Sequence, residues 1–192
     1  MKVDFPSEKD IEDYVQSAIE RDGRCPMSDF PVHICHRQYE IVGYGITDLI
    51  KITALQNCVN ITVTEFKNET LKAAHVEQLC RYMTGIKRIV NKYKRHGFCV
   101  ALCGELAGPY FQNGKPPNDL IYLKDFLPQN IFIYDLSLTY EHGFKATEIN
   151  GGWFRTSENY LAYRDVAKEI YNEFLYKKAC QKEKVVPIKG RN

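Results

Sequence analysis

Apolar residues recur at helical spacing in three parts of the chain. Over residues 7–21 they form a stripe behind Ser7, a residue type that often caps a helix N-terminus, and Asp22-Gly23 follows. A second helical pattern runs over 71–93. A third follows Ser157 and runs to about Lys178. The pattern therefore predicts three amphipathic helices.

Between the first two helices the apolar pattern changes to that of strands. We expect strands at 32–42, 46–52 and 61–67, with a bend at 43–45 and a connection over 55–60. Beyond the second helix, 98–103 is typical of a buried strand, 104–119 of a Gly-, Pro- and Asn-rich loop, and 131–140 and 144–149 of a hairpin, with 120–126 ambiguous. This order predicts an α/β domain over 1–180, a mixed β-sheet flanked by helices, followed by a basic C-terminal tail over 181–192.

The amino-acid composition restricts the possible partners and location of the protein only slightly. The 192 residues include 44% hydrophobic and 26% charged residues and carry a net charge of +2, which neither requires nor excludes a nucleic-acid partner. Seven scattered cysteines with no CxxC pair favour reduced thiols in a cytoplasmic protein. The N-terminus does not resemble a signal peptide, and no apolar run approaches the ~20 residues needed to cross a bilayer, so we expect no membrane partner.

Charged residues interrupt two of the predicted strands. Asp48 alternates with Ile46, Ile50 and Ile52, which places it on an apolar face, and Glu65 and Lys67 end the face that Ile61 and Val63 begin. Ionised groups on a core face are costly unless they are paired or bind a metal. One interpretation is an ion pair at the rim of the sheet.

The other interpretation is a metal site. Mg²⁺ (or Mn²⁺) prefers oxygen ligands and keeps several waters. The carboxylates of Asp48 and Glu65 and the backbone carbonyl of Phe66 would supply oxygens, and Lys67 would orient a water or stabilise developing negative charge. Gln78 and Tyr82 are four apart and so share one face of the second helix.

Together, Asp48, Glu65-Phe66-Lys67 and Gln78-x-x-x-Tyr82 resemble the PD-(D/E)xK nuclease superfamily, and the QxxxY element resembles its lambda-exonuclease-like branch. Gly45–Ile50 and Gln78–Tyr82 are also similar to archaeal-type mismatch and branched-DNA endonucleases. The resemblance covers roughly residues 7–104, and Thr47 stands where the motif has proline. It implies a restriction-endonuclease-like core and a Mg²⁺-dependent deoxyribonuclease.

The resemblance also implies roles for individual residues. Asp48 and Glu65 would bind the metal, Lys67 would be catalytic, and Gln78 and Tyr82 would support the site or contact DNA. An acidic residue of the first helix often completes such a site. Glu12 is our candidate, with Glu8 and Glu20 as alternatives, and a solvated helix face is the competing interpretation.

Contacts to DNA are expected from basic residues of the second helix, namely Arg81, Lys72, Lys87 and Arg88, although cations near a helix C-terminus also suit the helix dipole. The small size favours a homodimer or a partner protein. Two other functions stay open: a catalytically silent module that binds nucleic acid or protein on the same fold, and a purely structural α/β domain.

Overall fold

The computed structural model describes residues 2–3, 7–28, 30–55, 58–92, 99–111, 115–117, 119–120, 130–139 and 143–149. The predicted final helix and the basic tail lie outside these residues. The described elements are β1 (Lys2–Val3), α1 (Glu8–Asp22), β2 (Ile34–Ile41), β3 (Gly45–Leu55), β4 (Cys58–Phe66), α2 (Ala73–Lys92), β5 (Cys99–Gly108), β6 (Ile131–Thr139) and β7 (Gly143–Glu148).

The two described helices confirm the sequence predictions. Ser7 caps α1, since its hydroxyl accepts the backbone N–H of Asp10 at 3.2 Å. The helix ends at Gly23, whose left-handed φ of 67° lets its N–H bond to the carbonyl of Ile19 at 2.8 Å. The second helix, α2, begins two residues later than predicted.

The described strands form one mixed sheet in the order β1-β6-β5-β4-β3-β2, and β7 pairs with β6. The pairs β2–β3 and β3–β4 are antiparallel, whereas the pairs β4–β5 and β5–β6 are parallel. The sequence did not predict β1, which pairs with the end of β6.

Two predicted loops are partly strand. The expected connection over 55–60 is wrong, because β3 runs to Leu55 and pairs there with Cys58, the first residue of β4. The expected loop over 104–119 is wrong at its start, because β5 continues to Gly108 between β4 and β6. Gly104 suggested a break, but it lies against Met83 and Leu79 of α2, where a Cβ would be too close. This glycine permits close packing rather than ending the strand.

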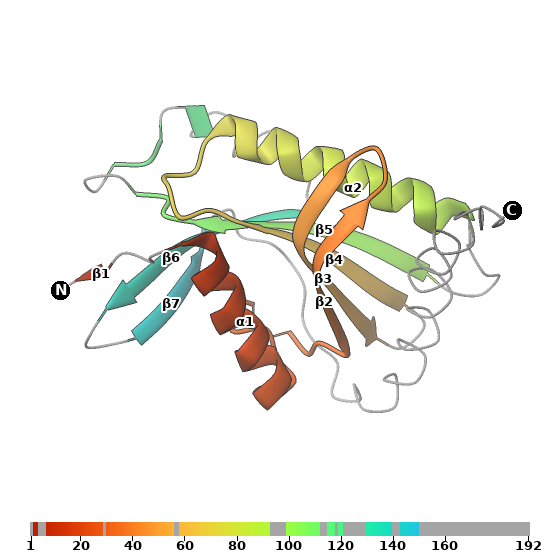
Figure 1. Ribbon diagram of the computed structural model, residues 1–192, viewed down its shortest axis with the longest axis horizontal. Helices are drawn as coiled ribbons and strands as arrows, with labels where there is room; N and C mark the ends of the chain where they lie inside the picture. Colours follow the sequence, from red (N-terminus) through yellow and green to blue (C-terminus); the bar gives the residue numbers. More distant parts are fainter. Residues whose placement is uncertain are drawn as a thin grey trace, which may run out of the picture.

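Each face of the sheet has its own apolar core. Residues of α2 such as Leu79 and Ile86 pack on Ile50, Ile52 and Ile61. On the opposite face, α1 packs on the sheet in a second apolar cluster, whose members include Ile11, Val15, Ile19, Leu49, Phe66, Phe132 and Tyr134. The arrangement of a helix on either side of the sheet, visible in Figure 1, confirms the predicted α/β class with a mixed sheet flanked by helices. Neither described helix combines the length and the hydrophobicity that a membrane-spanning segment needs.

The β2–β3 hairpin bends away from the sheet and lies over α2 (Figure 1). The bend coincides with Gln38, which has a left-handed φ of 45° and is missing from the otherwise regular pairing of β2 with β3. Arg37 and Gln38 follow one another, yet both side chains contact α1. Beyond the bend, Ile41 approaches Gly85 of α2 so closely that a Cβ there would lie 2.4 Å from its Cγ2.

Candidate active site

The candidate site forms where β3 and β4 separate. Their backbone pairing ends at Leu49 and Thr64. Beyond that point side chains take over the hydrogen bonds of the ladder: the Thr47 hydroxyl donates to the carbonyl of Thr64 at 3.0 Å, and the Asp48 carboxylate accepts the N–H of Phe66 at 2.7 Å. The backbone groups of β4 remain satisfied while the strands diverge, and Asp48 is held in the gap.

Glu65 lies at the centre of the site. One of its oxygens, Oε1, accepts hydrogen bonds from Lys67 Nζ at 2.8 Å and from Gln78 Nε2 at 2.6 Å. Gln78 Nε2 also donates to the Tyr82 hydroxyl at 2.8 Å. The other oxygen, Oε2, is buried and has no hydrogen-bond partner among the described residues. A buried carboxylate oxygen without a partner is rare and calls for a donor or a cation.

The first helix contributes two acidic side chains. Glu8 Oε2 lies 3.6 Å from Lys67 Nζ. Glu12 is buried, and both of its oxygens accept a bond from Gln38 Nε2 at 2.9 Å, while Oε2 also accepts from Arg37 at 3.0 Å. Gln38 reaches Asp48 at 3.4 Å and so links the helix to the strand site.

The other candidate of this helix, Glu20, lies elsewhere. It is exposed and bonds to Gln16 at 2.6 Å, two turns along the helix from Glu12. Among the three acidic residues considered from the sequence, only Glu8 and Glu12 border the site.

The acidic groups of the site have unusual ionisation. Burial raises the pKa of Asp48 to about 6, against the opposing effect of the Phe66 N–H, and the nearby charge of Glu12 adds to the rise. Burial raises the pKa of Glu65 to about 7, and the negative charge of Asp48 raises it further. Burial opposes the charged form of Lys67, but its hydrogen bond to Glu65 leaves its pKa above the usual value. The two carboxyls thus crowd negative charge into a poorly hydrated space.

The predicted common face of Ile46, Asp48, Ile50 and Ile52 is wrong. Ile50 and Ile52 belong to the core beneath α2, whereas Ile46 is 51% exposed and its neighbour Thr47 is fully buried. The alternation fails because the strand changes direction next to Gln38. In β4 the alternation holds, since Ile61 and Val63 join the same core and Glu65 reaches Gln78 of α2.

The basic residues proposed to contact DNA are all exposed on or near α2. The Arg81 guanidinium lies 5.5 Å from the ring centroid of Tyr82, and that of Arg88 lies 5.5 Å from the ring of Tyr44. Lys72 pairs with Glu69 at 2.5 Å. Lys87, one turn before Asn91, is exposed near the end of the helix.

Sequence reasoning missed Arg37 and Gln38. A left-handed backbone at a residue other than glycine has no simple sequence signal, and neither residue belongs to a motif. An Arg-Gln pair in a strand that otherwise alternates was the available hint.

The side chains that could bind a metal ion do not form a complete set of ligands. Among the described residues, no three His, Cys, Asp or Glu side chains gather as a ready metal site. The site does hold two neighbouring carboxyls, Asp48 and Glu65, and within the described part of the chain one oxygen of Glu65 is buried without a partner. This set fits a hard divalent cation that takes one or two carboxylates and keeps several waters. Comparison with protein-family models, with curated proteins and with solved structures found no match for the chain.

Proposed function

We propose that this protein is a metal-dependent DNA nuclease of the PD-(D/E)xK type, with a restriction-endonuclease-like core. The observation that carries the proposal is the environment of Glu65. One oxygen of this buried carboxylate accepts hydrogen bonds from Lys67 and Gln78, and the other has no partner among the described residues. The carboxylate also lies close enough to Asp48 for their charges to interact. A purely structural ion pair would need neither the second carboxylate nor the unsatisfied oxygen.

Asp48 and Glu65, with the backbone carbonyl of Phe66, would hold Mg²⁺ or Mn²⁺. When bound, such an ion would lower the pKa of a water and stabilise charge on a phosphodiester. Glu12 is a weaker ligand candidate than the other two carboxylates, because both of its oxygens already accept hydrogen bonds from Arg37 or Gln38.

Other side chains of the protein would complete the catalytic site and bind the DNA. The Lys67 ammonium lies where it can orient the attacking water and stabilise negative charge on the phosphate. Gln78 fixes the orientation of Glu65 and is itself aligned with the Tyr82 hydroxyl. Arg81, Lys72, Lys87 and Arg88 would contact the DNA backbone and make binding dependent on salt. The enzyme would act in the cytoplasm, as a homodimer or with a partner protein.

The test is cleavage of circular single-stranded, circular double-stranded and linear DNA in Mg²⁺ or Mn²⁺. Glu65→Ala and Lys67→Ala should abolish cleavage, whereas Glu77→Ala, which changes an exposed acid next to Gln78, should retain it. The circular substrates separate an endonuclease from an exonuclease.

Two results would contradict the proposal. DNA binding without cleavage under any metal would indicate the alternative, a catalytically silent binding module. No cleavage, no metal binding and no DNA binding would leave the charged cluster as a structural feature of the sheet.

A further inference from the structure

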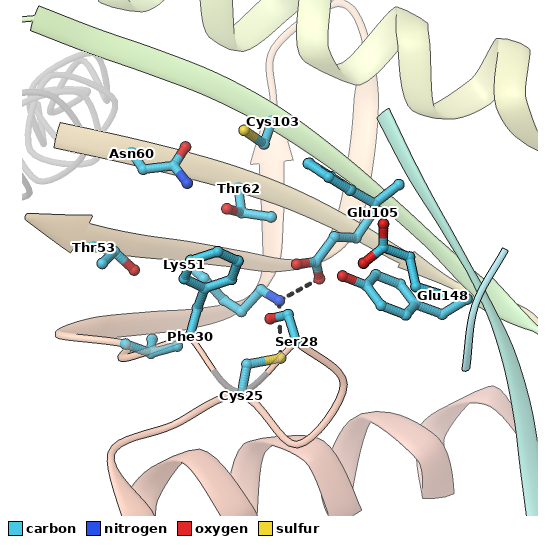
Figure 2. A pocket seen from close by; sticks show the side chains of 13 residues that line it. Cys25, Ser28, Phe30, Lys51, Thr53, Asn60, Thr62, Cys103, Glu105 and Glu148 are labelled. Atoms are coloured by element: carbon cyan, nitrogen blue, oxygen red, sulfur yellow. Dashed lines mark hydrogen bonds and ion pairs between the residues drawn. The ribbon is translucent and has the colours of Figure 1, made fainter. Parts of the chain in front are cut away.

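A second polar region lies on the α1 face of the sheet, where an apolar core would be expected. A cavity of about 120 Å³ is enclosed between the strands and the segment that follows α1 (Figure 2). The strands contribute polar side chains to it at every second position: Lys51 and Thr53 from β3, Asn60 and Thr62 from β4, and Glu105 from β5. Alternation along three neighbouring strands therefore builds one polar surface.

The two buried charges of this cavity are matched, and Glu148, the third charged lining residue, is exposed. Lys51 and Glu105 are 3% and 4% exposed and form an ion pair. Lys51 Nζ also lies 3.2 Å from the Cys25 thiol, and Glu105 also accepts from the Thr64 hydroxyl at 3.1 Å. A buried pair contributes little to stability compared with apolar packing, so its presence suggests another use. Because the two charges cancel, the cavity suits a neutral ligand with polar edges.

Two lining oxygens, Ser28 Oγ and Asn60 Oδ1, are buried and have no hydrogen-bond partner among the described residues. The Asn60 oxygen can only accept a hydrogen bond. Buried oxygens in native proteins are nearly always satisfied by protein, water or ligand. An N–H donor in the cavity would satisfy this acceptor.

The volume of the cavity and its lining residues limit the chemical class of ligand that it can bind. A cavity of about 150 Å³ in another protein holds a benzene ring, and this one, at about 120 Å³, is of similar size. Its rim includes Ser28 and Phe30, both partly exposed, so substituents of a ring can extend outward. Phe132 and Tyr134 of β6 add aromatic surface. Aromatic surfaces favour a planar ligand.

We propose that this cavity binds a nucleobase of pyrimidine size. A pyrimidine base is neutral, planar and carries both N–H donors and carbonyl acceptors, which match Asn60 Oδ1 and the Lys51 ammonium. Lys51 and Thr62 lie three residues along their strands from Asp48 and Glu65, or about 10 Å. The offset of three also puts Thr62 on the α1 face and Glu65 on the α2 face of the sheet, so a nucleotide would reach the cavity only through the gap where β3 and β4 diverge. The base could come from a free compound or, through this gap, from a nucleotide turned out of DNA at the proposed nuclease site.

The first experiment uses free bases and does not depend on the nuclease. Cytosine and uracil are titrated into the full chain in EDTA, and binding is followed by calorimetry and by saturation-transfer NMR, with the non-planar polyol inositol as a control ligand. A Kd on the order of 1 mM is ordinary for so small a ligand. Asn60→Leu and the isosteric Thr62→Val should each weaken binding about tenfold, whereas Asn91→Leu, an exposed amide of α2, should not.

The second experiment rests on the proposed function and tests DNA as the source. Oligonucleotides carrying pyrrolo-cytosine, which brightens when unstacked, are mixed with the wild-type chain and with Asn60→Leu in Ca²⁺. A rise in fluorescence with wild type alone supports a base delivered by DNA. Binding of free bases without this rise supports the site but contradicts delivery by DNA. Absence of both signals from a chain with a cooperative melt would overturn the proposal and leave a cavity that holds water only.

Discussion

Replacing Glu65 by glutamine should stabilise the metal-free protein at pH 8, although the same substitution should inactivate the nuclease. Burial raises the pKa of this carboxyl to about 7 from an ordinary 4.5. Each pKa unit corresponds to about 1.4 kcal/mol, so ionising Glu65 inside the fold costs about 3 kcal/mol at pH 8. Glutamine keeps the size and one acceptor oxygen and removes that cost. Lys67 loses its closest anion but keeps Glu8 at 3.6 Å, so we expect a net gain of about 1–2 kcal/mol.

The sign of the effect gives a pH test. A group whose pKa is raised by folding contributes stability below its unfolded pKa, and this contribution is lost as pH rises through the folded value. The cost of Glu65 is therefore below about 1 kcal/mol at pH 5, and the advantage of Glu65→Gln should disappear there. Urea unfolding in EDTA at pH 5 and pH 8 measures both values, with the exposed Glu77→Gln as control. A variant that is less stable than wild type at pH 8 would refute the reasoning.

Three further predictions follow from the same geometry. Lys67→Ala should slow single-turnover DNA cleavage at least about a hundredfold, and Lys67→Arg should recover part of the rate because the positive charge next to Glu65 is retained; equal rates for both would remove the charge argument. Mn²⁺ at a hundred times its Kd should stabilise wild type by about 2.7 kcal/mol in thermal melts, and Glu65→Ala should show no such shift. Gly85→Ala should cost about 1–3 kcal/mol in urea unfolding, because its Cβ would lie 2.4 Å from Ile41 Cγ2; Gly104→Ala, whose nearest contact is the flexible Met83 sulfur, should cost less.

The parts of the fold that the sequence predicted are those with local signals. Ser7 and Gly23 mark the ends of α1 through capping, and the apolar stripe places α2 to within two residues. The end of β5 was not predicted, because a glycine at position 104 suggests the end of a strand. Its true role, close packing against α2, cannot be seen in the local sequence. Long-range packing, which one chain segment does not reveal, decides such positions.

In the candidate site, too, contacts that follow from local patterns were predicted and contacts that depend on long-range structure were not. Periodicity along β4 placed Glu65 and Lys67 on one face, and helical spacing placed Gln78 next to Tyr82; both pairs are in contact. The backbone bond between Asp48 and Phe66 was not foreseen, because it exists only where β3 and β4 diverge. The divergence begins opposite Gln38, and no residue type in that segment predicts its left-handed backbone conformation.

The bend at Gln38 also affects how the folded chain meets other chains. Among the described strands, β2 is the last in the sheet, so its outer edge exposes backbone groups that could pair with a strand of another molecule. A left-handed residue in the middle of this strand interrupts the straight row of donors and acceptors that such pairing requires. The distortion that brings Gln38 to Glu12 and Asp48 therefore also protects the edge against aggregation, and a substitution that straightens β2 would make the protein less soluble as well as disturb the site.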